Sequence, residues 1–379
     1  MKRILTIIGA RPQIIKAAAI SRAIGNHFKD ELQEDLLHTG QHYDTNMSEV
    51  FFDELGIPRP KYNLNVGSGS HGAQTASMIA GIENILLQEK YDAVLVYGDT
   101  NSTIAGALAA SKIHIPVIHV EAGLRSFSKA MPEELNRIGC DHMSTLLFSP
   151  TKTGITNLAS EGIHHHETPW SMDHPGVFEC GDIMFDNSMF FAKEAQAKSE
   201  ILAHLGLTER SFGLCTIHRD TNTDQEEKLL GIIRALDTIA TDKEVAILLP
   251  LHPRTKGKLT EQMNQIISNN ERLIITEPLS FLDMVRAESA CAFVVTDSGG
   301  VQKEAFFFQK PCIILREQTE WVEIVENGNA VLTGSDSDKI VQSLHTLLQS
   351  ENQMTWPTIF GDGKAAEFIC STISDFLKA

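Results

Sequence analysis

Long hydrophobic runs, paired cysteine motifs and a surplus of positive charge are all missing from this 379-residue chain. No apolar run reaches the roughly eighteen residues of a membrane-spanning helix, and the apolar stretch at the N-terminus is too short for a secretory signal. The six cysteines show no CxxC spacing, which is typical of reduced thiols in a cytoplasm. The formal net charge of -17 disfavours nucleic acid and anionic membranes as partners. The composition therefore predicts a cytoplasmic globular protein in which basic residues at loop positions are informative, because an anionic ligand would need them.

Strand patterns alternate with helical patterns along nearly the whole chain, and the series restarts after Gly181. Such alternation indicates parallel sheets with helices on both faces. Two series predict an α/β fold of two doubly wound, Rossmann-like domains, residues 1–182 and 183–362, with a last helix over 363–379 that can pack back on the first. Because ligands of such sheets bind at the carboxyl ends of the strands, we expect the active site in the cleft between the domains. The predicted strands span residues 4–8, 35–39, 93–97, 117–120, 146–148, 212–217, 245–249, 273–276, 292–296 and 311–315.

The stretch 294–305 is the most informative one in the chain. Its β-branched residues predict a buried strand, followed by a turn and a helix over 299–308. Ser298 suits the N-cap, and Gly299 and Gly300 let a ligand approach the backbone. The free N–H groups and the positive dipole end of such a helix suit phosphate, and Glu304, about one and a half turns further on, could reach a ribose diol. The stretch predicts a nucleotide diphosphate site; the alternative is a strand-to-helix turn that needs glycine only for packing.

Three carboxylates follow neighbouring strand ends or open the next helix, namely Asp99, Glu121 and Glu133. Crowding and burial raise carboxylate pKa values, which allows an acid and a base to coexist near neutral pH. Any one of these residues could instead be a helix cap or a first-turn acid. Together, with Arg125 and Arg137 nearby, they favour a catalytic site.

Cations follow other predicted strands. Arg11 and Lys16 come after the first strand, His218 ends the first strand of the second domain, and Arg254 ends the next. The alternatives for these side chains are a helix-entry arginine, surface cations and a structural histidine. The first turn is not a GxGxxG fingerprint, which disfavours a nicotinamide site. The histidine-rich segment 162–179 is expected to be irregular, and it lacks the spaced partner ligands that a metal site needs.

Taken in order, these residues resemble a known family. The motifs that carry the resemblance are Gly9-Ala10-Arg11-Pro12-Gln13 with Lys16, Thr39-Gly40-Gln41-His42, Gly98-Asp99-Thr100, Val120-Glu121-Ala122-Gly123-Leu124-Arg125, Pro132-Glu133-Glu134-Leu135-Asn136-Arg137, His218-Arg219 and Thr296-Asp297-Ser298-Gly299-Gly300. Over about residues 3–375 they resemble the non-hydrolysing UDP-N-acetylglucosamine 2-epimerase family, a match that is specific as a combination. The resemblance implies a GT-B-like pair of Rossmann domains, a homodimer, a UDP-sugar and UDP as ligands, and no metal or redox cofactor.

The resemblance also implies roles for the residues that match its motifs. Asp99, Glu121 and Glu133 would be acid-base groups at the sugar, and His218 would contact phosphate or carry a proton. Contacts with the nucleotide would come from Arg11, Lys16, Ser298, Gly299 and Gly300 at the diphosphate, Glu304 at the ribose, and the loop around Ser280 and Phe281 at the uracil. The further substrate-binding candidates are Gln41, His42, Arg125, Arg137 and Arg254.

Within that family the chain departs from the usual UDP-N-acetylglucosamine enzymes. It carries Gly-Ala-Arg-Pro-Gln for Gly-Thr-Arg-Pro-Glu, Tyr43-Asp44-Thr45-Asn46-Met47 for Arg-Glu-Met-Leu, and Thr319-Glu320-Trp321-Val322-Glu323 for Thr-Glu-Arg-Pro-Glu. Residues 39–52, 124–134 and 301–325 look closer to the branch that acts on UDP-2,3-diacetamido-2,3-dideoxyglucuronic acid for O-antigen and related surface polysaccharides. We therefore expect that uronic acid nucleotide to be preferred, with Arg125 and Arg254 as candidates to meet its C6 carboxylate.

The expected reaction is 2-epimerisation by elimination and re-addition of UDP. A glycosyltransferase of the same architecture, a hydrolysing epimerase and a non-catalytic UDP-sugar-binding regulator are the alternatives. Three carboxylates at the sugar disfavour the regulator. Exchange of the C2 hydrogen with solvent separates an epimerase from a glycosyltransferase, which leaves that hydrogen untouched.

Overall fold

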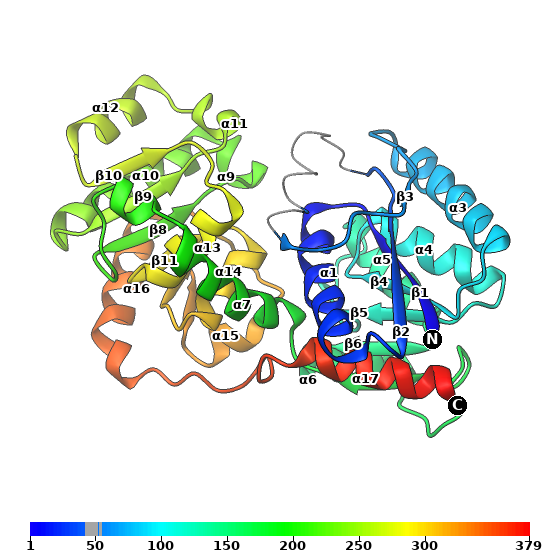
Figure 1. Cartoon of the computed structure of the whole chain (residues 1–379). Helices are drawn as coiled ribbons and strands as arrows, with labels where there is room; N and C mark the ends of the chain where they lie inside the picture. Colours follow the sequence, from blue (N-terminus) through cyan, green and yellow to red (C-terminus); the bar gives the residue numbers. More distant parts are fainter. Residues whose placement is uncertain (42–51, 53–54) are drawn as a thin grey trace. The chain divides into compact units, whose positions relative to one another are not determined.

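The structure, a computed structural model, describes residues 1–41, 52 and 55–379 and divides into two compact units (Figure 1). Unit 1 comprises residues 1–187 and 358–379, and unit 2 comprises residues 188–357. The chain leaves unit 1 within helix α7 (Ile183–Lys198). Its last helix, α17 (Ala365–Lys378), belongs to unit 1, where Ser374 and Lys378 both bond to Glu31.

Unit 1 is built on a parallel sheet with strand order β3-β2-β1-β4-β5-β6-β7, a doubly wound order extended by one strand. Its strands are β1 (Lys2–Ile8), β2 (Leu32–His38), β3 (Tyr62–Asn63), β4 (Ala93–Tyr97), β5 (Val117–Val120), β6 (Leu146–Ser149) and β7 (Gly176–Glu179). In the register of the two central strands, Ile4 of β1 lies opposite Ala93 of β4. Every residue of β4 is buried, as expected for a parallel strand covered on both faces.

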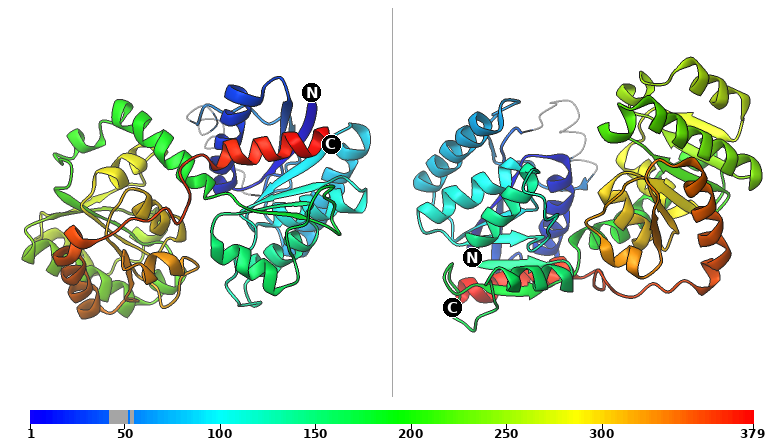
Figure 2. Two further views of the ribbon diagram at one scale, coloured as in Figure 1. Left: turned by 90° about the horizontal axis from the view of Figure 1, so that it is seen from below. Right: turned by 180° about the vertical axis from the view of Figure 1, so that it is seen from behind.

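Helices lie on both faces of this sheet (Figure 2). They are α1 (Arg11–Ala23) with the π-helical turn η1 (Ile24–Phe28), α3 (His71–Gln88), α4 (Asn101–Lys112), α5 (Pro132–His142), α6 (Lys152–Ser160) and α17. Helix α4 packs against α3 and α5, and α1 packs against α17. Thr100 and Thr151 cap α4 and α6 by accepting hydrogen bonds from backbone N–H groups, so each helix begins directly after its strand.

Unit 2 repeats the same plan with a parallel sheet of order β10-β9-β8-β11-β12-β13. Its strands are β8 (Phe212–Thr216), β9 (Ala246–Pro250), β10 (Leu273–Thr276), β11 (Phe293–Thr296), β12 (Cys312–Ile314) and β13 (Ala330–Leu332). Its helices are α8 (Ile201–His204), α9 (Asp220–Thr223), α10 (Glu226–Asp242), α11 (Pro253–Lys256), α12 (Glu261–Asn269), α13 (Phe281–Ala290), α14 (Gly299–Phe307), α15 (Val322–Glu326), α16 (Ser337–Ser350) and the 3-10 turn η2 (Glu351–Gln353). One apolar core joins the sheet to α10, α12 and α16.

The predicted fold of two doubly wound, Rossmann-like domains is confirmed, and each predicted strand is present, with ends that match or differ by at most three residues. Three short strands, β3, β7 and β13, were missed. Strand β7 lies within the segment 162–179, which was expected to be irregular throughout. It pairs with β6 at the edge of the sheet, so a contact with a distant strand decides its conformation.

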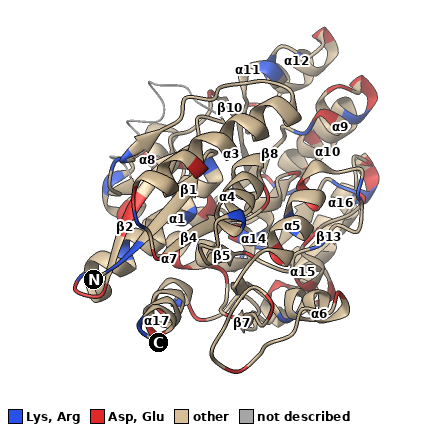
Figure 3. Cartoon of the chain, turned by 90° about the vertical axis from the view of Figure 1, so that its right-hand side faces the viewer, with Lys and Arg blue, Asp and Glu red and all other residues tan. Residues whose placement is uncertain are grey.

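None of the helices in the described part of the chain combines the length and the apolar character needed to cross a bilayer. Basic and acidic residues are interspersed over the helices of both units (Figure 3). The chain has 49 acidic and 32 basic residues, so basic side chains at strand ends are a local enrichment against an acidic background.

Candidate active site

The candidate residues lie where the strand order of each sheet reverses, at the carboxyl ends of the central strands. In unit 1, Arg11 follows β1, Asp99 follows β4 and Glu121 follows β5. In unit 2, His218 follows β8 and Ser298 follows β11. Doubly wound folds bind their ligands at this reversal, because the connections on its two sides leave toward opposite faces of the sheet.

An ion pair between Lys16 of α1 and Glu121 joins two of these strand ends. Both side chains are largely buried, with exposed fractions of 12% and 11%. Glu121 has a φ of +74°, a left-handed conformation that costs a residue other than glycine about 1–3 kcal/mol and is common at functional sites. Gly98, with a φ of +59°, lies against the pair: a Cβ there would be 3.1 Å from Glu121 Oε2 and 3.3 Å from Lys16 Nζ.

Asp99 lies beside the same pair and has a perturbed pKa. Burial raises the pKa of the Asp99 carboxyl. The charges of Arg137 and Lys16 act in the opposite direction, while Glu121 and Glu133 add to the rise. The structure thus brings the three predicted carboxylates into electrostatic contact, with Glu133 exposed in the first turn of α5.

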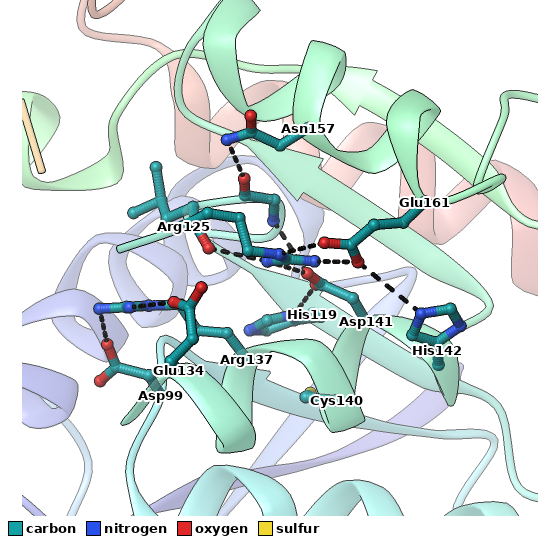
Figure 4. Close-up of polar contacts among 12 residues, drawn as sticks. Asp99, His119, Arg125, Glu134, Arg137, Cys140, Asp141, His142, Asn157 and Glu161 are labelled. Atoms are coloured by element: carbon teal, nitrogen blue, oxygen red, sulfur yellow. Dashed lines mark hydrogen bonds and ion pairs between the residues drawn. The ribbon is translucent and has the colours of Figure 1, made fainter. Parts of the chain in front are cut away.

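Arg137, on α5, lies between Asp99 and Glu134 (Figure 4). Its Nη2 is 2.5 Å from Asp99 Oδ2, and its Nη1 donates to Glu134 Oε2 at 3.1 Å. Glu134 also accepts from the backbone N–H groups of Ser126 and Phe127 at 2.8 and 2.9 Å. Burial opposes ionisation of Glu134, yet these bonds lower its pKa. Arg137 therefore ties Asp99 to the loop that follows β5.

Arg125 is engaged by acids of unit 1 (Figure 4). Only 1% of its side chain is exposed, and its Nε and Nη2 donate to the two Glu161 oxygens at 2.8 Å. Its Nη1 lies 2.8 Å from Asp141 Oδ2 and donates to the Leu124 carbonyl at 2.7 Å. The expectation that Arg125 meets a carboxylate of the substrate is therefore wrong, because two protein carboxylates already enclose its guanidinium.

Two glutamines organise the strand ends of unit 1. Gln13, buried at the start of α1, accepts from the N–H groups of Gly9 and Ala10 and donates to the Tyr97 carbonyl at 3.0 Å. Gln13 thus fixes the turn after β1 to the end of β4. The sequence motif that contains Gln13 did not predict this structural role. The oxygen of Gln41 accepts from the Ser102 hydroxyl at 2.7 Å, at the start of α4. His42, another predicted ligand, lies outside the described residues.

In unit 2, Asp297 orients His218. The Nδ1 atom of His218 is 3.1 Å from Asp297 Oδ1, and the backbone N–H of Arg219 and the amide of Asn222 donate to Asp297 Oδ2 at 3.0 and 3.1 Å. Burial alone would raise the pKa of Asp297, but these interactions, led by the one with His218, lower it. Because Nδ1 faces a carboxylate, Nε2 is the nitrogen of the half-exposed ring that Asp297 does not engage.

Helix α14 begins at the end of β11, as predicted. The Ser298 hydroxyl accepts from the Val301 N–H at 3.5 Å and caps the helix. Helix geometry leaves the first N–H groups, those of Gly299 and Gly300, free of intrahelical acceptors, and the positive end of the helix dipole favours an anion there. Glu304 Oε2 is 3.9 Å from the position of a Cβ on Gly300, so its carboxylate lies beside the helix start.

Arg316 was missed by the sequence interpretation, although it follows β12 as other candidates follow their strands. Its Nη1 donates to Glu320 Oε2 at 2.8 Å. A Cβ on Gly299 would lie 3.8 Å from Glu320 Oε2, 3.8 Å from Trp321 Nε1 and 3.9 Å from Arg316 Nη1. Arg316 and Arg219 also line a cavity of about 280 Å³ in unit 2. A cation and an indole N–H donor therefore adjoin the start of α14.

Arg254, in the short helix α11, is half exposed. It forms ion pairs with Asp220 at 2.8 Å and Asp224 at 3.1 Å. A surface arginine of this kind can exchange its partners for a ligand, since exposed ion pairs contribute only about 0–1 kcal/mol.

Phe281 points into the core of unit 2. It is buried and packs edge-on against Phe191, with ring centroids 5.0 Å apart. Ser280 caps α13 by accepting from the Asp283 N–H at 3.2 Å. The ring of Phe281 therefore has a packing role, and the contact of the loop around Ser280 and Phe281 with uracil stays a prediction.

Within the described ranges no group of three or more His, Cys, Asp or Glu side chains is arranged to hold a metal ion. In the histidine-rich segment 162–179, His165 bonds through Nδ1 to the backbone of Val177 at 3.0 Å.

Comparison with known proteins identifies relatives over the whole chain. The family model for UDP-N-acetylglucosamine 2-epimerase matches residues 26–374. A UDP-N-acetylglucosamine 2-epimerase homolog of Methanococcus maripaludis is 46% identical over 366 residues, covering 96% of this chain and 97% of the relative. A UDP-2,3-diacetamido-2,3-dideoxy-D-glucuronate 2-epimerase of Pseudomonas aeruginosa is 45% identical over 379 residues, covering 99% of each. The crystal structure of Methanocaldococcus jannaschii UDP-GlcNAc 2-epimerase in complex with UDP-GlcNAc and UDP superposes with a TM-score of 0.83 at 40% identity, over 98% of this chain and 99% of that one.

Proposed function

The chain belongs to the UDP-N-acetylglucosamine 2-epimerase family and is an isomerase of that type; from this premise we propose that it inverts C2 of a UDP-N-acetyl sugar by eliminating and re-adding UDP, without net hydrolysis. The observation that carries the proposal is the meeting of Lys16, Asp99 and Glu121 at three adjacent strand ends. These groups supply proton transfer and positive charge in one place.

The chemistry at C2 explains why acid-base groups and positive charge are needed together. The C2 hydrogen of a UDP-N-acetyl sugar is not adjacent to a carbonyl, so no enolate can stabilise its removal. Departure of UDP from C1 creates a C1–C2 double bond instead, and the products are a 2-acetamidoglycal and UDP. Re-addition of UDP to C1, with a proton delivered to the opposite face of C2, gives the epimer. The reaction therefore requires acid-base groups around C2 and stabilisation of the departing diphosphate.

Unit 1 supplies the groups for C2 in this proposal. Asp99 and Glu121 are each paired with a cation, Arg137 and Lys16, but burial still raises the pKa of Asp99. A carboxyl with a raised pKa can donate a proton while its neighbour accepts one. The two roles exchange between the forward and reverse directions. Glu133, exposed at the start of α5, is the third candidate.

Unit 2 supplies the groups for UDP in this proposal. The N–H groups at the start of α14 and the Nε2 atom of His218 would bind the diphosphate, and Glu304 would bind the ribose. Arg316 adds positive charge beside the same helix start. Arg11, exposed at the first turn of α1, contributes a cation from unit 1.

The preferred substrate is proposed to be the UDP-2,3-diacetamido-2,3-dideoxyglucuronate nucleotide. This rests on the sequence stretches that resemble that branch and on the relative from Pseudomonas aeruginosa. Of the two arginines predicted to meet the C6 carboxylate, Arg254 remains the candidate, because Arg125 is enclosed. A pocket built for a carboxylate discriminates against a substrate that lacks it, since its cation is then left unpaired. The same branch suggests a role in the synthesis of surface polysaccharide precursors.

Proton NMR tests the epimerase reaction and the substrate preference. UDP-N-acetylglucosamine and the UDP-2,3-diacetamido-2,3-dideoxyglucuronate nucleotide are each incubated with the enzyme. We expect the second epimer to appear while still attached to UDP, with little free UDP. Stoichiometric UDP and free sugar would instead identify a hydrolysing epimerase, and turnover only with an added acceptor would identify a glycosyltransferase. An equal or higher kcat/KM for UDP-N-acetylglucosamine would refute the substrate preference and leave the epimerase in place. We also propose that the protein is a homodimer. Analytical ultracentrifugation tests this, and we expect a molar mass twice the 41.8 kDa of one chain.

A further inference from the structure

His119, on β5, is completely buried two residues before Glu121. Its Nδ1 lies 2.7 Å from Asp141 Oδ1, and its Nε2 lies 2.8 Å from the Gly98 carbonyl oxygen (Figure 4). A carbonyl oxygen can only accept a hydrogen bond, so Nε2 carries a proton. The Gly123 N–H and Arg125 both bind Asp141 Oδ2, which favours an ionised Asp141 that accepts from His119 Nδ1 at Oδ1. The ring is thus held between two acceptors.

The environment of the ring agrees with this assignment. Burial disfavours a charge on the imidazole, yet the pKa of His119 lies well above its usual value, because Cys140 and the Asp141 carboxylate face the ring. With no exposed surface, His119 cannot touch a substrate. Its effect must pass through the groups that it binds.

Those groups flank two of the carboxylates. The Gly98 carbonyl immediately precedes Asp99, and the Gly123 N–H that Asp141 binds lies two residues after Glu121. Gly98 and Glu121 both have positive φ angles, +59° and +74°. Glycine adopts such an angle without strain, but for Glu121 it persists only when the surrounding structure over-determines it, and the ends of β4 and β5 share this one buried pair.

We propose that the His119–Asp141 pair is a positioning device for the epimerase chemistry, in which the proton on His119 Nε2 holds the Gly98 carbonyl and thereby sets the distance between the Asp99 and Glu121 carboxylates. The inference rests on the proposed function, because it assigns a purpose to the geometry of the two acid-base groups. His119 and Asp141 are positioning residues and take no part in proton transfer to the sugar.

Two conservative variants of His119 separate positioning from packing. The side-chain amide nitrogen of His119→Gln falls near Nε2 and can still donate to the Gly98 carbonyl. That of His119→Asn falls near Nδ1 and can still donate to Asp141, but it loses Gly98. Both variants remove the charge. We expect kcat of His119→Asn to fall about 10- to 100-fold below that of His119→Gln, since a displacement of about 1 Å can cost about 100-fold. KM and the affinity for UDP should change less than about threefold, because UDP binding is assigned to unit 2.

Equal kcat values in the two folded variants would overturn the proposal, as would a loss of kcat that only follows a loss of thermal stability. Wild-type enzyme in the same assay separates this result from failure of the proposed function, because only the latter abolishes epimerisation by the wild type. A second measurement needs no variant. In wild-type enzyme labelled with ¹⁵N-histidine we expect the His119 ring to carry a proton on Nε2 at pH 8, and a His119 ring with an unprotonated Nε2 would equally overturn the proposal.

Discussion

Replacing Asp99 by asparagine should abolish most activity and leave the fold nearly as stable as before. The substitution removes an acid-base group, so we expect kcat to fall at least about 100-fold. Its effect on stability is the sum of two opposing terms. Loss of the charge-assisted contact with Arg137, 2.5 Å long, costs about 1.5–3 kcal/mol, and removal of a partly buried charge, whose pKa desolvation raises, offsets part of that cost. Since Arg137 keeps its bond to Glu134, we expect the free energy of unfolding to change by about 1 kcal/mol or less.

Asp141→Asn is the matched control, because it makes the same isosteric change at a carboxylate of unit 1 with no exposed surface. Asp141 is bound by Arg125 at 2.8 Å and by His119 at 2.7 Å, so its loss leaves two buried cations without their shared anion. This should cost about 3–5 kcal/mol. Urea unfolding followed by circular dichroism measures stability, and product formation at saturating UDP-sugar measures kcat. Near-wild-type turnover of Asp99→Asn, or a loss of stability as large as that of Asp141→Asn, would refute the reasoning.

Three further predictions follow from the strand ends. His218→Ala should weaken UDP binding by about 1.5–3 kcal/mol in calorimetry, while the exposed surface variant His204→Ala should leave it unchanged; equal affinities would show that His218 points elsewhere. Gly98→Ala should lower kcat about tenfold or more, because its Cβ would press on Glu121, whereas Gly162→Ala, with φ +82° and open space around it, should reduce only stability. The lowered pKa of Asp297 means that its ionised form stabilises the fold above about pH 4 and that this contribution is lost as pH falls through the folded pKa. The urea midpoint of Asp297→Asn should therefore lie below that of wild type at pH 7, and the difference should shrink as the pH falls below about 4; a constant difference would contradict this.

Much of the fold could be predicted because it depends on local patterns. Buried parallel strands are near-continuous apolar runs, and caps such as Thr100 and Ser298 mark where helices begin. The rule that ligands bind at the carboxyl ends of parallel strands predicts Asp99 and Glu121 as site candidates from the sequence alone. The short strand β7 escaped prediction because its conformation depends on pairing with β6, which no local pattern records.

The partners of side chains could not be predicted in the same way. Arg125 occupies a motif position like those of the other candidates, but its guanidinium is taken up by Asp141 and Glu161, 16 and 36 residues further along the chain. Arg316 follows a three-residue strand too short to draw attention to its end. Spacing in the sequence identifies which residues reach the edge of a sheet, whereas tertiary packing decides which of them remain available to a ligand.

The measurement that tests the central claim most directly is deuterium incorporation at C2. The UDP-sugar is incubated with the enzyme in D2O and both epimers are analysed by NMR and mass spectrometry, with Asp99→Asn as the inactive control. Because elimination removes the C2 proton and re-addition delivers another from a carboxyl group in exchange with solvent, we expect deuterium at C2 in the product and, with time, in the recovered substrate, with little free UDP. Epimers that form without deuterium at C2 would contradict the account. So would the absence of any epimer with both UDP-N-acetylglucosamine and the UDP-2,3-diacetamido-2,3-dideoxyglucuronate nucleotide.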